Sequence, residues 1–463
     1  MDVAFSLAEH IVNTRYDMLP PRVGEITKTF IIDTIGVGLA GSGTPGNADV
    51  IDLLKGWGGR PESTVMVHGL RVPAPQAAFA NSLLIHSPDY DDTFDRTATH
   101  TNVTALPAAL SAAEMLGRSG KALITAVALG VDLTCRLALS SHLFHGWHNT
   151  TTVGIFGAVA AAGKILGLDK EQMRNALGIA YSQAAGNRQG REDGAQTKRL
   201  QPAFAAQAGL MSALLARAGV SGAQNIFQGQ WGFFRLYRDH QQPFEPEKWA
   251  AALTDELGSR FEGVNLGAKP YPCVRCAHAP IDGALQLAAD KQINPDEIDD
   301  VTVFTNERVI DTAGGPFVIR TNPEVDAKFS IPYTVAVALI KRRVALDDFR
   351  EAAVRNPAVG ALAQKVKVVV GPEFKGSVST MGPIVVAVRL KNGTELAQRV
   401  ELTSGHPQNP MSEKALLEKF TDCCRHAARA PSSEKIERLL ESLRALETVS
   451  DIGSLMQMTV GGE

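Results

Sequence analysis

The sequence predicts a mostly α-helical protein, with a large all-helical domain and a smaller α+β domain inserted before the C-terminal helices. Apolar residues recur at helical spacing through 1–265, β-branched runs are confined to 266–405, and amphipathic helical patterns return in 406–463. We therefore expect 1–265 together with 406–463 to form the helical domain. At 463 residues the chain also exceeds the ~250–300 residues at which single cores stop growing, which favours two domains.

The first 265 residues contain many segments in which apolar side chains return every three or four positions. Several of these segments end in glycine, as helices commonly do. Their abundant alanine and glycine predict close helix packing, because small side chains let helix axes approach. The segments are SLAEHIVNT, GEITKTFIIDTIGVGLAG, NADVIDLLKGWG, APQAAFANSLLI, NVTALPAALSAAEMLG, GKALITAVALGVDLTCRLAL, TVGIFGAVAAAGKILGL, DKEQMRNALGIAYSQAAG and QPAFAAQAGLMSALLARAG.

The second domain is marked by three stretches rich in β-branched residues. They are IDDVTVFTN, KVKVVVG and GPIVVAVRLKNGTELAQRVEL, and the last contains Asn392-Gly393, a strong hairpin signal. Between them, YTVAVALIKRR and LDDFREAAV have helical patterns. Beyond residue 405, SEKALLEKFTDCCRHA and SSEKIERLLESLRALE are amphipathic, and we expect these helices to pack back onto the first domain.

Charge and cysteine content limit the partners and the compartment. Lys+Arg total 46 against 49 Asp+Glu, with no long run of one sign, which argues against nucleic acid or an anionic membrane as the main partner. No stretch of 18 or more apolar residues lacks charges, so no membrane span is predicted. Five cysteines do not suggest a disulfide framework, and the N-terminus carries acids and an amphipathic pattern. We expect a cytoplasmic protein.

Two short motifs suggest cofactor or metal sites but lack the necessary context. GVGLAG (Gly36, Gly38, Gly41) follows a helical pattern and precedes the breaker cluster SGTPGN, so it predicts close helix packing and not a dinucleotide loop. CVRC (Cys273, Cys276) has zinc-ligand spacing, but the adjacent Cys423-Cys424 make a poor second pair. We interpret these cysteines as buried thiols.

The segment HSPDYDDTFDRTATH, residues 86–100, places four aspartates between two apolar helical segments. Asp89, Asp91 and Asp92 offer oxygen ligands for Mg²⁺ or Fe, yet no Gly or Glu stands where a calcium loop requires it. Because the spacing fits no ligand template, we predict no metal site and expect Asp91 and Asp92 to cap or brace the turn.

Similar polar clusters recur at the mouths of other apolar segments. Each alone is typical of a helix cap or a solvated face. Five clusters that mix acids, imidazoles and cations better suit a shared cleft. They are HSPDYDDTFDRTATH, HGWHNTT with His145 and His148, GREDGAQTKRLQP with Lys198 and Arg199, YPCVRCAHAPID with Arg275 and His278, and DAKFSIPYTVAVA with Lys328 and Tyr333.

In order and spacing, HSPDYDDTFDRTATHTNVTALPAALSAAE, GWHNTTTVGIFGAVAAAGKILGL, GAQTKRLQPAFAAQAG and KPYPCVRCAHAPIDGAL resemble the signature segments of the MmgE/PrpD family. That family includes 2-methylcitrate dehydratase, cis-aconitate decarboxylase and iminodisuccinate epimerase. The resemblance covers nearly the whole chain. It implies a large helical domain, a smaller α+β domain, a homodimer and an active site between the domains.

Motif by motif, the resemblance implies functional roles for individual residues of this chain. The matching positions are Asp89 and Thr93 of SPDYDDT, His100 of TATH, His148 of GWHNT, Lys198 of QTKRL, His278 of CAHAPID and Tyr333 of FSIPYTVA. Two departures from the family pattern fall where the substrate is expected to bind. Family decarboxylases have a segment like DDTWHPATH, whereas this chain is one residue longer and carries Asp95-Arg96; TKRLQP also lacks the histidine that often follows in TKRLHP.

These residues predict a cofactor-independent lyase that dehydrates or decarboxylates a small di- or tricarboxylate. We expect Asp89 and His100 to move protons from one side, with His278 or Tyr333 opposite. Cations would hold the substrate carboxylates: Lys198, His148, Arg275 and Arg199, with Thr93 orienting the substrate or Asp89. No cofactor is needed, because adjacent carboxylates provide the electron sink. The alternatives are an epimerase of an iminodisuccinate-like dicarboxylate and a non-catalytic carboxylate-binding paralogue.

Overall fold

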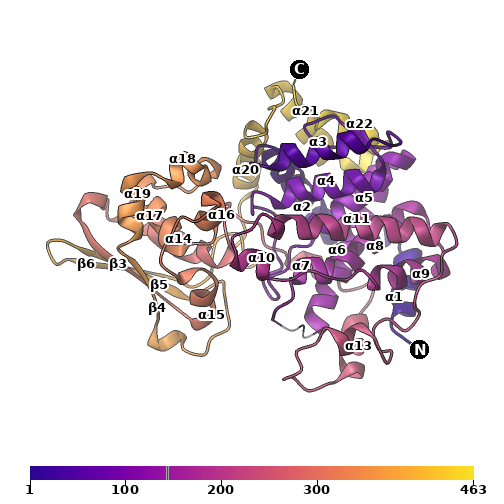
Figure 1. The fold of residues 1–463 in the computed structure, drawn as a ribbon, viewed down its shortest axis with the longest axis horizontal. Helices are drawn as coiled ribbons and strands as arrows, with labels where there is room; N and C mark the ends of the chain where they lie inside the picture. Colours follow the sequence, from indigo (N-terminus) through magenta and orange to yellow (C-terminus); the bar gives the residue numbers. More distant parts are fainter. Residues whose placement is uncertain (142, 144, 463) are drawn as a thin grey trace.

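Two large hydrophobic cores divide the chain in the computed structural model, which describes residues 1–141, 143 and 145–462. The larger core joins side chains from the first 268 residues with side chains from 420–456. The smaller core uses side chains from 273–400. Figure 1 shows the smaller domain beside the larger one, with the C-terminal helices lying on the larger domain. The prediction of a mostly α fold with a smaller α+β unit is confirmed.

The large domain is a stack of helices around the buried helices α5, α6 and α8. All helices expected in this region are present, and α4, α5, α6, α8 and α11 pack against one another. The helices are α1 Ala4–Asn13, α2 Pro21–Gly41, α3 Asn47–Trp57, α4 Ala74–His86, α5 Asn102–Leu116, α6 Gly120–Ser140, α7 Asn149–Thr152, α8 Gly154–Leu166, α9 Lys170–Tyr181, α10 Gln189–Glu192, α11 Thr197–Arg217, α12 Phe233–Leu236 and α13 Pro246–Thr254. Two antiparallel strands of two residues each, β1 Ser63–Thr64 and β2 Arg71–Val72, also lie in this domain, so it is not entirely helical as predicted.

The C-terminal helices return to the large domain. They are α20 Glu413–Arg425, α21 Ser433–Arg444 and α22 Ile452–Met458. Helices α20 and α21 pack on α2, and α22 packs on α5. The chain therefore leaves the large domain once and comes back, so the small domain is an insertion in space as well as in sequence.

The small domain has one four-stranded sheet in the order β4-β3-β5-β6. Its strands are β3 Ile298–Thr305, β4 Val366–Val370, β5 Ile384–Leu390 and β6 Glu395–Val400. Strand β3 is parallel to β4 and antiparallel to β5, and β5 forms a hairpin with β6. The predicted turn lies at this hairpin, where Gly393 has φ +85°. Helices α14 His278–Asp290 and α17 Ile331–Lys341 cover one sheet face, and the remaining helices are α15 Glu307–Val309, α16 Pro323–Lys328, α18 Glu351–Val354 and α19 Pro357–Ala363.

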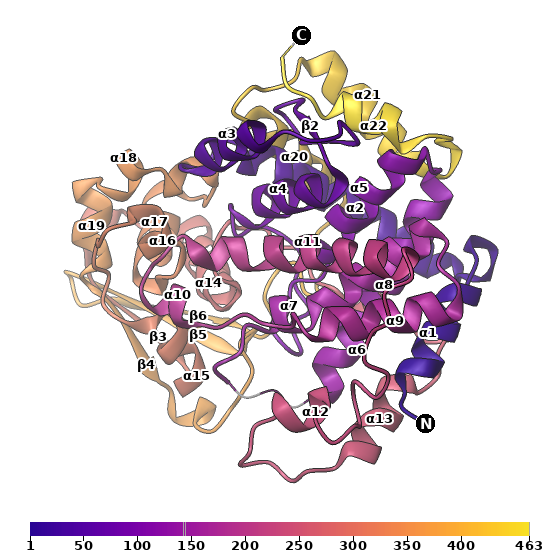
Figure 2. The same cartoon turned by 45° about the vertical axis from the view of Figure 1, so that its right-hand side comes forward.

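Helix α11 links the large domain to the site described below. In Figures 1 and 2 it crosses the large domain, and its N-terminal end points toward α10 and α16. This end carries the QTKRL motif in its first turn. The fold thus places the predicted lysine at the junction of the two domains.

Helix α6 is long and apolar enough to cross a membrane by length and composition alone. Most of its residues are buried inside the protein, against α8 and the neighbouring helices. Its apolar character is accounted for by core packing.

The glycine-rich stretch GVGLAG lies inside α2, where its glycines permit close helix contacts. A Cβ on Gly41 would lie 1.8 Å from the Leu84 carbonyl oxygen of α4, and one on Gly38 would lie 2.6 Å from the Met66 side chain. The interpretation of this motif as a packing feature is confirmed.

Helices α6 and α8 make a similarly close crossing at Gly157. We predict that Gly157→Ala lowers the melting temperature, because the added Cβ would lie 2.0 Å from Thr134 Oγ1 and 2.6 Å from the Gly130 carbonyl oxygen. Overpacking of this kind costs about 1–3 kcal/mol. Gly24→Ala in α2 is the matched control, since its Cβ meets nothing within 4 Å, and it should stabilise by about 0.5–1 kcal/mol. Scanning calorimetry measures both; equal melting temperatures for the two variants would contradict the close crossing.

Candidate active site

The acidic segment between α4 and α5 lies at the seam between the domains and is not a surface turn. Its first three aspartates are at most 5% exposed. Thr93 and Gly267 exchange backbone hydrogen bonds of 2.9 and 2.7 Å, and the Tyr90 hydroxyl donates to the Pro270 carbonyl oxygen. These bonds attach the acidic segment to residues 267–270, which lead into the small domain.

Asp89 forms the central ion pair of the site. Lys198 Nζ donates to Asp89 Oδ1 (2.7 Å), while Lys269 Nζ donates to the Asp89 carbonyl oxygen (2.9 Å) and lies 3.5 Å from Oδ2. Burial by itself would raise the pKa of Asp89, but the two ammonium groups outweigh it and hold the pKa well below its usual range. Asp89 adopts a left-handed backbone (φ +56°), which aspartate tolerates better than most residues.

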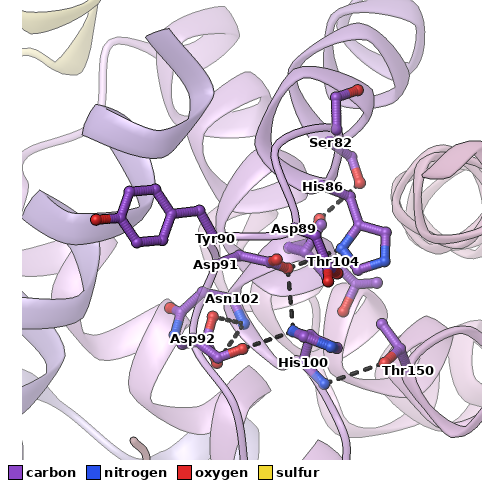
Figure 3. A network of polar contacts seen from close by, with 12 residues as sticks. Ser82, His86, Asp89, Tyr90, Asp91, Asp92, His100, Asn102, Thr104 and Thr150 are labelled. Carbon is purple, nitrogen blue, oxygen red and sulfur yellow. Dashed lines mark hydrogen bonds and ion pairs between the residues drawn. The ribbon is translucent and has the colours of Figure 1, made fainter. Parts of the chain in front are cut away.

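His100 is held by its Nδ1 atom. Figure 3 shows Asp91 between His86 and His100. His100 Nδ1 lies 2.7 Å from the Asp92 carbonyl oxygen and 3.3 Å from Asp91 Oδ2, and both of these atoms are acceptors. The proton is therefore on Nδ1, which leaves Nε2 as the nitrogen available to the cavity. His86 Nδ1 lies 2.8 Å from the same Asp91 oxygen.

Asp92 caps helix α5, as predicted for this part of the segment. Its carboxylate accepts hydrogen bonds from Thr101 N (3.0 Å), Thr101 Oγ1 (2.8 Å) and Asn102 N (3.2 Å). These are donors at the helix N-terminus, which otherwise lack partners. The α5 cap thereby fixes the loop that carries His100.

A cavity of about 390 Å³ opens beside these groups, with walls from both domains. Six of the nine predicted side chains line it: Asp89, Thr93, His100, His148, Lys198 and Arg275. Cations outnumber acids in the lining, which also contains Lys269, Arg188, Arg191 and Arg308 against Asp89 and Asp239. A cavity of this charge favours an anionic ligand.

His278 is not among the lining residues but stands directly behind one of them. Arg275 Nη1 lies 3.2 Å from His278 Nδ1, so the imidazole accepts there and its Nε2 donates to the Cys273 carbonyl oxygen (3.3 Å). Arg275 also makes a two-bond ion pair with Asp95 (3.1 and 3.0 Å). The structure therefore gives His278 contact with Arg275, whereas the sequence placed it at the reacting atoms.

Arg199 and Tyr333 also lie outside the cavity lining. The Arg199 guanidinium donates to the Pro45 carbonyl oxygen and borders a smaller hollow that Lys198 also lines. Tyr333 is fully buried in the small-domain core against Phe317, and its hydroxyl donates to the Asp348 carbonyl oxygen. Packing of α17 turns Tyr333 inward, so the predicted role opposite His100 finds no geometric support.

His148 lies at the start of α7 and is oriented by Gln201, which stands where the family pattern often has a histidine. Gln201 Oε1 lies 3.3 Å from His148 Nδ1 and accepts from Asn187 N (2.9 Å). Thr151 Oγ1 is 3.1 Å from the same imidazole nitrogen. The glutamine of TKRLQP therefore joins His148 to the 186–194 loop.

Several lining residues were missed by the sequence reasoning. Lys269 lies in the KPYPC segment that carried the resemblance, but a lone lysine before proline gives no signal of its pairing with Asp89. Arg191 lies in the quoted GREDGAQTKRLQP segment, and Arg188 lies two residues before it. Arg308 follows β3 in a segment with no motif.

One group among the described residues has metal-ligand geometry, namely His86, Asp91 and His100. The hydrogen bonds that join His86 and His100 to Asp91 account for the short distances among these three side chains. Asp89 and Asp92 face lysines and the α5 terminus instead, so the three aspartates do not converge on one point. Cys273 and Cys276 are buried thiols, and burial raises the pKa of Cys276 to about 12.

The buried imidazoles favour their neutral forms. Burial and Lys198 lower the pKa of His86 to about 4. Burial and Lys198 hold the pKa of His148 well below its usual range, and burial and Arg275 do the same for His278. At neutral pH these rings can therefore accept hydrogen bonds or protons, whereas Asp89 carries charge.

Models of one protein family match almost all of the chain. The MmgE/PrpD N-terminal domain matches residues 6–245, and the MmgE/PrpD C-terminal domain matches residues 271–445. The break between the matches coincides with the passage from the large to the small domain.

Curated relatives in this family are named as decarboxylases and dehydratases. A human cis-aconitate decarboxylase is 28% identical over 98% of this chain and 94% of its own length. A cis-aconitate decarboxylase-like protein of Aspergillus oryzae is 26% identical over 99% of this chain and 98% of its own length. A 2-methylcitrate dehydratase of Cupriavidus necator is 24% identical over 88% of this chain and 87% of its own length. The chain therefore belongs to the MmgE/PrpD family.

Proposed function

We propose that this protein is a cofactor-independent lyase that removes carbon dioxide or water from a small di- or tricarboxylate. The observation that carries the proposal is the geometry of His100, whose Nδ1 is bound by the loop and whose Nε2 is left to a cavity rich in cations. Proton transfer beside a carboxylate needs a positioned base or acid and positive charge near the growing negative charge. His100 and the Lys198–Asp89 pair meet these needs.

The two reactions use the same groups. In dehydration, His100 takes a proton from the carbon next to a carboxylate, the C–O bond breaks, and the departing hydroxide is protonated. In decarboxylation, the C–C bond to a carboxylate breaks, its electron pair moves toward a neighbouring unsaturated carboxylate, and an acid returns a proton to carbon. In both, Lys198 and Lys269 stabilise charge on the substrate carboxylate. Decarboxylation is the first reaction to test, because five relatives with decarboxylase in their names cover 96–99% of this chain.

Epimerisation of an iminodisuccinate-like polycarboxylate is the second candidate. It is favoured by the departure at Asp95, which stands where the family decarboxylase segment differs and which is paired with the lining residue Arg275. A purely carboxylate-binding role is the third candidate, and the presence of both His100 and Lys198 in the cavity weighs against it.

The proposal is tested by incubating the protein with cis-aconitate, 2-methylcitrate and iminodisuccinate in D₂O and following the reaction by NMR. Carbon dioxide release, water loss, or exchange with epimer formation identifies the decarboxylase, the dehydratase or the epimerase. Absence of turnover and of exchange with all three would contradict the lyase proposal and favour the binding role.

We predict that Lys198→Ala and His100→Gln each lower kcat/KM on the substrate found in this way by about 10²–10⁴-fold. The first removes the positive charge paired with Asp89, and the second removes the nitrogen that transfers the proton. Lys367→Ala, on the exposed part of β4, is the control and should retain wild-type activity. Wild-type kinetics in both cavity variants would overturn the assignment of these groups.

We predict that His86→Gln makes the melting temperature less sensitive to acid. Unfolded histidine has a pKa of about 6.5, whereas that of buried His86 is about 4. Between these values the unfolded state binds more protons, so this group's stabilising contribution is present above about pH 6.5 and is lost as pH falls toward 4. Asp89 acts in the same direction only below about pH 4. Melting curves from pH 7.5 to 4.5 measure the effect, and identical pH slopes for the variant and the wild type would contradict it.

We also propose a homodimer, as the resemblance implies, with the exposed face of α11 in the interface. Phe204, Met211 and Leu215 lie on one helical face and are 55%, 41% and 37% exposed. We predict that light scattering gives the mass of a dimer and that Met211→Glu with Leu215→Glu shifts it toward the monomer. Met18→Glu, at an exposed site far from α11 in sequence, is the control. A wild-type monomer would refute the dimer.

A further inference from the structure

Three arginines line the outer part of the cavity and take no part in the chemistry proposed above. Arg188 precedes α10, Arg191 lies in it, and Arg308 lies in α15 of the small domain. Figure 1 places α10 between the two domains. The three guanidinium groups therefore come to the cavity from both sides of the domain junction.

These outer arginines differ from the inner cations in how they are paired. The inner groups each face a carboxylate: Lys198 and Lys269 contact Asp89, and Arg275 contacts Asp95. That pairing sets three cations against two carboxylates, so most of the positive charge at the inner end of the cavity is compensated.

The positive charges of the three outer arginines are compensated much less by nearby carboxylates. The Arg188 guanidinium contacts only the side chain and carbonyl oxygen of His145 within the described part of the chain. The Arg308 side chain has no hydrogen bond or ion pair to any residue that the structure describes. Arg191 pairs with the adjacent Glu192, on the exposed rim.

The arginines repel one another, and Asp239 is the only acid besides Asp89 in the described lining of the cavity. Burial together with Arg191 and Arg308 lowers the pKa of Arg188 to about 10, even though Glu192 acts in the opposite direction. Glu192, Glu307 and Asp311 border a neighbouring hollow but are absent from the cavity lining. Positive charge that is only partly compensated thus faces the cavity, and a bound oxyanion would relieve the repulsion.

We propose that Arg188, Arg191 and Arg308 form a subsite for a distal oxyanion of the substrate, separate from the carboxylate at the Lys198–Asp89 pair. This inference rests on the proposed function and narrows its substrate class to molecules that carry an anionic group in addition to those held at the inner end of the cavity. The planar guanidinium group binds carboxylate or phosphate oxygens through two parallel hydrogen bonds. Because the three arginines come from both domains, the distal oxyanion would also tie the small domain to the large one.

The test is binding of unreactive ligands by calorimetry, which does not depend on turnover. The probes are succinate, propane-1,2,3-tricarboxylate, and 2-(phosphonomethyl)succinate, in which a phosphonate replaces one carboxylate. We expect the double variant Arg188→Ala/Arg308→Ala to weaken binding of the tricarboxylate, the phosphonate analogue or both by about tenfold or more, while succinate affinity changes less than about twofold. The analogue that loses more affinity identifies the distal group as carboxylate or phosphate. Arg217→Ala, an exposed arginine at the end of α11, is the matched control and should bind all probes as the wild type does.

Unchanged affinity for both larger probes in the double variant would overturn the subsite, and so would an equal loss for succinate. Lys198→Ala should weaken all three probes, which separates the inner end of the cavity from the outer end. A protein that shows the predicted binding pattern but no turnover would refute the lyase proposal and leave the subsite intact. Turnover by the wild type, together with unchanged ligand affinity in the double variant, would support the lyase proposal and refute the subsite.

Discussion

Four aspartates within seven residues, all with buried carboxylates, must each be neutralised, and this requirement organises the junction of the two domains. Asp89 is met by two lysines, Asp91 by two imidazoles, Asp92 by the N-terminus of α5 and Asp95 by Arg275. A buried carboxylate that loses its partner costs about 3–5 kcal/mol. The partners come from α4, α5, α11, the inter-domain connection and the small domain, so satisfying the charges also fixes how these elements meet.

The same requirement arranges the groups on which the proposed chemistry depends. Holding Asp91 and the Asp92 carbonyl oxygen against His100 fixes the tautomer of the imidazole and leaves Nε2 available to the cavity. Pairing Asp89 with Lys198 keeps a carboxylate and an ammonium group side by side within reach of a ligand. Groups that neutralise the buried loop are therefore also the groups that can move protons and bind carboxylates.

Charge also divides the cavity into two ends. The inner cations are each paired with an aspartate, so a substrate carboxylate there must share its cations with protein groups. The outer arginines have fewer acidic partners and offer their hydrogen bonds directly to a ligand. Such a division would place the reacting carbon at the inner end and let the outer end select among anionic substrates.

The sequence alone determined the fold class, because helical periodicity, β-branched runs and the Asn392-Gly393 turn are local properties that agree with the tertiary structure. Ordered motifs likewise placed six of nine predicted side chains at one cavity. Only the tertiary structure decided which way the others face. Packing of α17 turns Tyr333 into a core, the Arg275–Asp95 pair stands in front of His278, and Arg199 turns toward Pro45. Lys269 carries no local signal, since its partner Asp89 lies 180 residues earlier in the chain. The outer arginines carry none either, because Arg188 and Arg191 meet Arg308 only when the two domains pack together.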